Sequence, residues 1–213
     1  MVADATFFKR TFGIIVIRAS HLRANLYCAP VINEKTEDYL RARVFLENKG
    51  FKFTAAVIDG KRGVKELFGD IPVQICHYHQ KAIITRYLTM KPKLEASKEL
   101  KEVVSSLCQS NEKEFVARLE DWHKKWADFL KEKSIDPAGG GWHFTHKRLR
   151  AAYRSLKTNL PNLFTYQRFP ELEIPNTTNS LEGSFAHLKQ LINVHCGMTR
   201  KLKLKIIREI LGI

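Results

Sequence analysis

The first thirty residues contain three consecutive strand-like runs: Val2-Ala3-Asp4-Ala5-Thr6-Phe7-Phe8, Gly13-Ile14-Ile15-Val16-Ile17-Arg18 and Asn25-Leu26-Tyr27-Cys28-Ala29-Pro30. Polar residues separate the runs, and β-branched and aromatic side chains are frequent in the first two, as is typical of strands. Because the connections are short, an antiparallel meander is predicted.

After the meander, helical and strand patterns alternate. Apolar residues at helical spacing, ending before Gly50, predict the first helix, and β-like runs predict further strands. This order indicates an α/β fold in which helices cover a mixed sheet, with acidic residues at the strand ends where such sheets place their sites. The predicted elements are a helix at 37–47, a strand at 55–59, a short helix at 64–68, a strand at 73–76 and a helix at 79–89.

The pattern from about residue 92 to 158 is helical alone, interrupted by glycines at 139–141. An all-α insertion at 92–158 is therefore predicted between a first core part, 1–91, and a return segment, 159–213. Trp122 and Trp126 lie on one face of a predicted helix, so they are interpreted as core residues of the insertion. The return segment ends in a helix that is expected to begin near Ser180.

The composition is strongly basic. Of the 213 residues, 36 are lysine or arginine and 22 are aspartate or glutamate, which gives a formal charge of +14. Such a balance favours a polyanionic partner, nucleic acid first, although a basic surface without a special role is compatible with it.

No apolar run approaches the roughly 18–20 residues of a membrane span, and no signal-peptide pattern is present, so an intracellular protein without a membrane partner is expected. The four cysteines show no paired framework, which agrees with a reducing compartment.

Three carboxylates lie on separate predicted elements. Asp4 is inside the first strand, Asp59 ends another, and Glu182 begins the last helix. Oxygen ligands on separate elements are what a divalent-metal site for phosphoryl transfer requires. Each also has a simpler interpretation: Asp4 on an exposed strand face, Asp59-Gly60 as a turn, and Glu182 as a capping-box partner of Asn179. Asp4 and Asp59 would lie on neighbouring strands if the first strand is central.

Basic residues gather near these carboxylates and in the second half of the chain. Lys61 and Arg62 lie between two glycines at a helix start, which is a suitable place for a backbone phosphate. A further run on and after the last helix would lie along a DNA backbone if Glu182 faces a metal, and cations of the insertion would extend that surface. The candidate DNA-binding residues are Lys61, Arg62, Lys147, Arg148, Arg154, Lys189, Arg200, Lys201 and Lys203.

Cys76 and His79 have the C-x-x-H spacing of half a zinc site. The only comparable pair, His195-Cys196, lies far along the chain, so a complete structural zinc site is not favoured. His77 and His79 are equally compatible with partly buried histidines that only form hydrogen bonds.

Several stretches of the chain together resemble one family. They are Asp4-Ala5-Thr6-Phe7-Phe8, Ile58-Asp59-Gly60 with Gly63, Pro72-Val73-Gln74-Ile75-Cys76-His77-Tyr78-His79-Gln80, Thr145-His146 with Ala152-Tyr153-Arg154-Ser155-Leu156, and Ile174-Pro175-Asn176-Thr177-Thr178-Asn179-Ser180-Leu181-Glu182-Gly183. In this order they resemble the Mutator-like transposases and their bacterial insertion-sequence relatives, over nearly the whole chain.

The resemblance implies a ribonuclease-H-like catalytic domain of a DDE-type transposase. Asp4, Asp59 and Glu182 would bind two Mg²⁺ ions, or Mn²⁺, that activate water and then a DNA 3′-hydroxyl for strand cleavage and joining. Cys76 and His79 would belong to a signature near the active site. Transposon ends and target DNA are the implied partners, with a possible homodimer, in a bacterial cytoplasm at the nucleoid.

Such transposases carry an N-terminal region that reads the terminal repeats, whereas Asp4 follows the first methionine by three residues here. The chain is therefore expected to be a catalytic core without that front portion. Two alternatives remain open: an inactive, transposase-derived DNA-binding remnant, and a general metal-dependent nuclease of the same fold.

Overall fold

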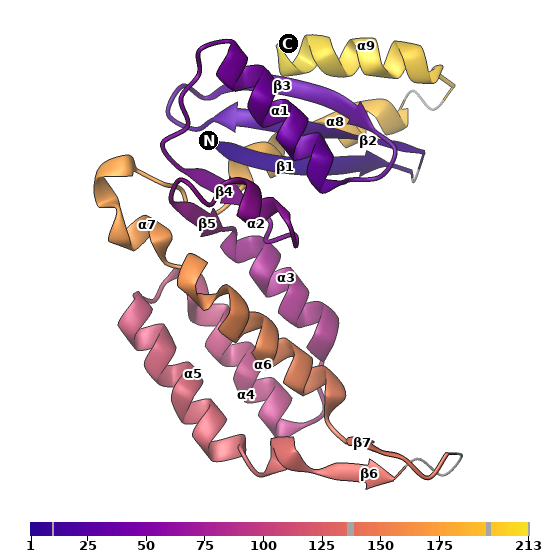
Figure 1. The fold of residues 1–213 in the computed structure, drawn as a ribbon. Coiled ribbons are helices and arrows are strands. Elements are labelled where there is room, and N and C mark those ends of the chain that lie inside the picture. Colours follow the sequence, from indigo (N-terminus) through magenta and orange to yellow (C-terminus); the bar gives the residue numbers. More distant parts are fainter. Residues whose placement is uncertain (10, 136–138, 195–196, 213) are drawn as a thin grey trace. The chain divides into compact units, whose positions relative to one another are not determined.

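The computed structural model describes residues 1–9, 11–135, 139–194 and 197–212 (Figure 1). The chain divides into two compact units, one of residues 1–76 with 169–213 and one of residues 77–168. The first unit contains the sheet and the second is mainly helical. The predicted insertion, 92–158, is shorter than the helical unit, because the helix that begins at His77 packs against the other helices.

The first unit is built on a five-stranded mixed sheet of order β3-β2-β1-β4-β5. The predicted meander is present as three antiparallel strands, while the last two strands run parallel to β1. β1 is thus the middle strand, which confirms the expected α/β class with a mixed sheet. The strands are β1 (Val2–Phe8), β2 (Phe12–Ala19), β3 (Ala24–Val31), β4 (Ala56–Ile58) and β5 (Val73–Ile75).

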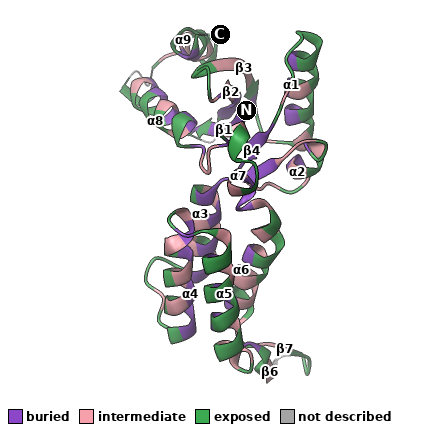
Figure 2. Ribbon diagram, turned by 90° about the vertical axis from the view of Figure 1, so that its left-hand side faces the viewer, coloured by how far each residue is buried: buried purple, intermediate pink, exposed green. Residues whose placement is uncertain are grey.

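Helices cover both faces of this sheet (Figures 1 and 2). Tyr39, Ala42 and Leu46 of α1 pack in one core with the strand residues that point to that side, among them Ala3 and Ile17. The other side faces α8 and α9, and α8 contacts β1. The helices of this unit are α1 (Thr36–Asn48), α2 (Val64–Leu67), α8 (Asn179–Val194) and α9 (Arg200–Leu211).

The second unit packs its helices around a separate core. Trp122 is buried there as expected, and its indole N–H donates to Ala96 O at 2.9 Å; Trp126 is half-buried and donates to Glu99. The helices are α3 (His77–Leu88), α4 (Glu95–Ser105), α5 (Glu112–Trp126), α6 (Lys147–Asn159) and α7 (Thr165–Arg168), with short 3₁₀ turns at Ser106–Cys108, Phe129–Lys131, Leu160–Asn162 and, in the first unit, Pro170–Leu172.

One feature of the second unit was not predicted. The predicted helix that carries Trp122 and Trp126 ends at Trp126, and a two-stranded antiparallel hairpin follows, formed by β6 (Lys133–Ile135) and β7 (Trp142–Phe144). Each strand is only three residues long, which is too short to show a period in the sequence.

The meander supplies much of the core, and its stability can be tested at Ile17. This side chain is fully buried, and Ile17 pairs with both Ala3 and Tyr27 in the middle of the sheet. Ile17→Ala should lower the free energy of unfolding by about 2–5 kcal/mol, because it leaves a cavity between packed strands. Urea denaturation followed by circular dichroism measures the change.

Ile32→Ala is the matched control, since Ile32 is 69% exposed. It should change stability by less than about 0.5 kcal/mol. Equal effects of the two substitutions would contradict the packing described for the sheet.

Candidate functional site

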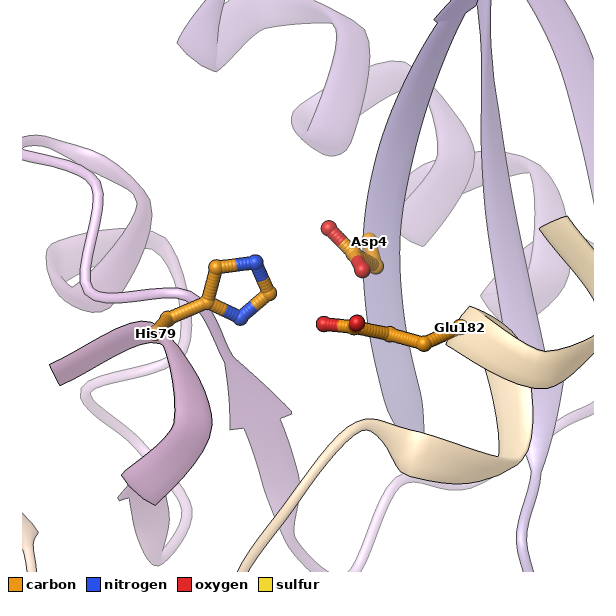
Figure 3. A group of neighbouring side chains, drawn as sticks. All are labelled: Asp4, His79 and Glu182. Carbon is orange, nitrogen blue, oxygen red and sulfur yellow. The ribbon is translucent and has the colours of Figure 1, made fainter. Parts of the chain in front are cut away.

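Two of the three candidate carboxylates point toward one another in the first unit (Figure 3). Asp4 is in the centre of β1, opposite Val16 of β2, and only 5% of it is exposed. Glu182 is in the first turn of α8. Ligand oxygens of the two side chains lie within 4.8 Å of one another, although 177 residues separate them in the sequence.

The strand pattern explains how Asp4 reaches this position. Side chains alternate along a strand, so Val2 and Asp4 point to one face while Ala3 and Ala5 point to the α1 face. The backbone N–H of Ala5 donates to Asp4 Oδ1 at 2.8 Å. A buried carboxylate is costly unless hydrogen bonds or a cation compensate it, and this burial rules out the simpler interpretation of Asp4 as an exposed strand residue.

Asp59 directly follows β4, the strand that pairs with β1. β4 pairs in parallel with β1 at Val2 and Val57, so a continuation by two residues brings Asp59 next to Asp4 on the same face. Neighbouring strands lie about 4.8 Å apart. Its Oδ1, however, accepts the backbone N–H of Lys61 at 2.8 Å, which is the turn contact expected after a strand.

Among the described residues, Asp59 is not in a group whose ligand atoms lie within 4.8 Å of both Asp4 and Glu182. The convergence of all three carboxylates therefore stays a prediction.

A hydrogen-bonded chain links Glu182 to the end of β5. Thr178 Oγ1 donates to Glu182 Oε1 at 3.4 Å, and the same hydroxyl lies 3.3 Å from Cys76 Sγ. The thiol also accepts the backbone N–H of Thr178 at 3.3 Å. Cys76 and Thr178 are fully buried, so the start of α8 is attached to the sheet immediately before Glu182.

The structure corrects the capping interpretation of Glu182. α8 begins at Asn179, one residue earlier than expected, and the backbone N–H of Glu182 donates to Thr178 O at 3.1 Å. The Glu182 carboxylate accepts the Thr178 hydroxyl, a contact that the capping interpretation did not include. Sequence reasoning missed the role of Thr178, although its i,i+4 spacing to Glu182 is a signal that could have indicated it.

The C-x-x-H pair divides between two roles. Cys76 is the last residue of the first segment of the first unit and contacts Thr178. His79 is half-buried in the first turn of α3, in the helical unit, with its ring 5.9 Å from that of Tyr78. His77 is buried, its Nε2 is 2.5 Å from Leu163 O, and burial lowers its pKa. This imidazole is a structural residue of the helical unit.

The described residues place no thiolate with two other ligand-type side chains within 4.8 Å. His195 and Cys196, the other pair with zinc-ligand chemistry, lie outside the described residues.

The candidate DNA-binding cations have different surroundings. Lys61 donates to Glu34 O at 2.5 Å and pairs with its carboxylate, so it orders the loop after β4. The Arg148 guanidinium donates to Arg86 O, and the guanidinium carbon of Arg200 lies 5.5 Å from the Phe12 ring centroid. Lys203 is half-buried, and the remaining candidates are exposed: Arg62, Lys147, Arg154, Lys189 and Lys201.

Comparisons with known proteins leave the family open: no family model matches the chain, and no curated protein is significantly similar to it. In the part of the chain that the structure describes, no helix is both long and apolar enough to cross a membrane.

The hydrogen bond from Thr178 to Glu182 leads to a prediction about cation binding. Thr178→Val keeps the shape of the buried side chain but removes the hydroxyl that meets both Glu182 and Cys76. Loss of such a supporting contact typically weakens metal binding by about 10–100-fold. Mn²⁺ titration followed by calorimetry measures the affinity.

Thr177→Val is the matched control, because the neighbouring Thr177 is only half-buried. It should bind Mn²⁺ as the unchanged protein does. Unchanged affinity in Thr178→Val would show that Glu182 needs no support from this hydroxyl.

Proposed function

We propose that the chain is the catalytic domain of a DDE-type DNA transposase with a ribonuclease-H-like sheet. In this proposal Asp4, Asp59 and Glu182 hold divalent metal ions and the domain cleaves and joins DNA strands. The observation that carries the proposal is the approach of the Asp4 and Glu182 carboxylates to within 4.8 Å, from the middle strand and from a helix distant in sequence.

The donor set fits Mg²⁺ or Mn²⁺. Both prefer carboxylate oxygens, and two carboxylates this close repel each other unless a cation or a proton lies between them. When bound, such an ion supplies a Lewis acid and an activated water or hydroxyl for an attack on phosphorus. Because carboxylates supply the oxygen ligands that Mg²⁺ and Mn²⁺ prefer, the proposal needs no histidine or cysteine ligand from the first unit.

The residues themselves have distinct tasks in this proposal. Asp4 would present its carboxylate from a buried position in the centre of the sheet. Glu182 receives the Thr178 hydroxyl, which fixes the direction of its carboxylate. Asp59, beside Asp4 in register, would complete the set if its carboxylate turned from the Lys61 amide toward the pair.

The charge of the protein supports DNA as the substrate. A net charge of +14 favours a polyanion, and each phosphate that the protein neutralises adds salt-dependent affinity. Exposed cations are present in both units, with Arg62, Lys189 and Lys201 in the unit of the carboxylates. Transposon ends and target DNA are the proposed substrates, a homodimer the proposed assembly, and the bacterial nucleoid the proposed location.

The proposal predicts metal-dependent nicking of a supercoiled plasmid. Mg²⁺ or Mn²⁺ should support nicking, and EDTA should abolish it. Asp4→Asn should lower the rate about a hundredfold or more, because a metal ligand accounts for several kcal/mol of transition-state stabilisation. Agarose-gel electrophoresis of the nicked product measures the rate.

Asp121→Asn is the control, since Asp121 is an exposed carboxylate on α5. It should nick at the unchanged rate. Nicking with no joining of a labelled 3′-hydroxyl end would identify a general nuclease. DNA binding without nicking, unaffected by Asp4→Asn, would identify a non-catalytic DNA-binding protein and contradict the proposal.

A further inference from the structure

The β6–β7 hairpin of the helical unit exposes apolar side chains on one face. In its register Lys133 is opposite Phe144 and Ile135 is opposite Trp142, so these four residues share a face. Ile135 is 76% exposed and Trp142 is 59% exposed. A two-stranded hairpin is marginally stable alone, and an exposed apolar pair on it indicates a binding surface.

Cations lie on the aromatic rings of this face. Lys133 Nζ is 3.8 Å from the centroid of the Trp142 ring, and the guanidinium carbon of Arg150 is 3.5 Å from that of Phe144. Trp142 and Phe144 meet edge to face, with centroids 5.4 Å apart. Rings that alternate with cations match a nucleotide strand, in which flat bases alternate with phosphates.

A basic groove lies in the same unit, and Arg150 both lines this groove and contacts the Phe144 ring of the hairpin. The groove has a volume of about 310 Å³, and its cations are Lys131, Arg150, Arg154 and Lys157. No carboxylate is among its described lining residues. The rings of His123 and Tyr153 stack at 4.5 Å and form part of its wall.

The groove cations differ in how firmly they are held. Arg150 donates to Leu130 O at 2.6 Å, which fixes its guanidinium between the groove and the Phe144 ring. Lys131 pairs with Asp128 at the surface, while Arg154 and Lys157 are exposed. The groove thus offers a positive path that begins at Arg150, beside the aromatic face.

We propose that this surface binds a nucleic-acid strand with unpaired bases. A base stacks on Trp142, and the phosphates that follow it lie in the groove against Arg154 and Lys157. The cations favour a nucleic acid over an apolar protein as the partner, because binding of an apolar partner needs no positive charges. The proposal concerns only the helical unit and does not depend on the metal chemistry of the carboxylates.

Binding of a fluorescein-labelled dT oligonucleotide of about ten nucleotides tests the proposal, with EDTA present so that no metal is required. Trp142→Leu should weaken binding about tenfold or more, because leucine keeps the apolar bulk but has no π face. Trp142→Phe should retain most of the affinity. Fluorescence anisotropy measures the affinity, and quenching of tryptophan emission should accompany binding in the unchanged protein but fall in Trp142→Phe.

A second pair of variants tests the groove without altering the hairpin. Arg154→Ala should lower the salt dependence of binding, the slope of log affinity against log salt, by about 0.7. Lys113→Ala, which removes an exposed cation of α5, is its control. Circular dichroism of every variant verifies the fold.

Preference for the oligonucleotide over a duplex of the same length supports the proposal, whether or not an RNA strand binds as well. Equal binding of Trp142→Leu and the unchanged protein would overturn it, as would equal competition by the duplex. The same measurement on Asp4→Asn should give the unchanged affinity. Failure of strand binding and failure of plasmid nicking are therefore separate outcomes.

Discussion

The burial of a carboxylate in the middle of the sheet is the constraint around which the first unit is organised. Asp4 is 5% exposed on the central strand, where transfer from water is costly without compensation. The amide of Ala5 supplies one hydrogen bond, and the Glu182 carboxylate approaches from α8. Two ionised carboxylates this close repel each other, which is why the pair is the basis of the proposed cation site.

The surrounding contacts hold the pair in place. Cys76 at the end of β5 and Thr178 before α8 bring together segments that are 102 residues apart in the sequence. Their hydroxyl and thiol are buried, so the direction of Glu182 depends on packing at the sheet edge. A site whose ligands are oriented by such contacts binds a metal ion with less loss of side-chain entropy.

The helical unit has a separate surface of exposed aromatic and basic side chains. Trp122 is buried in its core, and the Trp122 indole N–H donates to Ala96 O. Trp142, in contrast, is exposed on a short hairpin. Arg150 contacts both the hairpin and the basic groove. Tryptophans of the same unit therefore have different roles: one packs in the core and another lies on the surface. The residue type alone does not tell these roles apart.

The sequence by itself determined the strand meander and the α/β class, because alternating apolar runs predict strands. It also nominated Asp4, since a carboxylate within such a run is costly without a compensating cation, and Glu182 as an oxygen ligand on a separate element. Tertiary structure alone decided that β1 is the middle strand and that Thr178 meets both Glu182 and Cys76. It also decided that Asp59 Oδ1 accepts the Lys61 amide and that residues 133–144 include a hairpin. These features depend on strand pairing and side-chain direction between distant segments, and local sequence patterns carry no record of either.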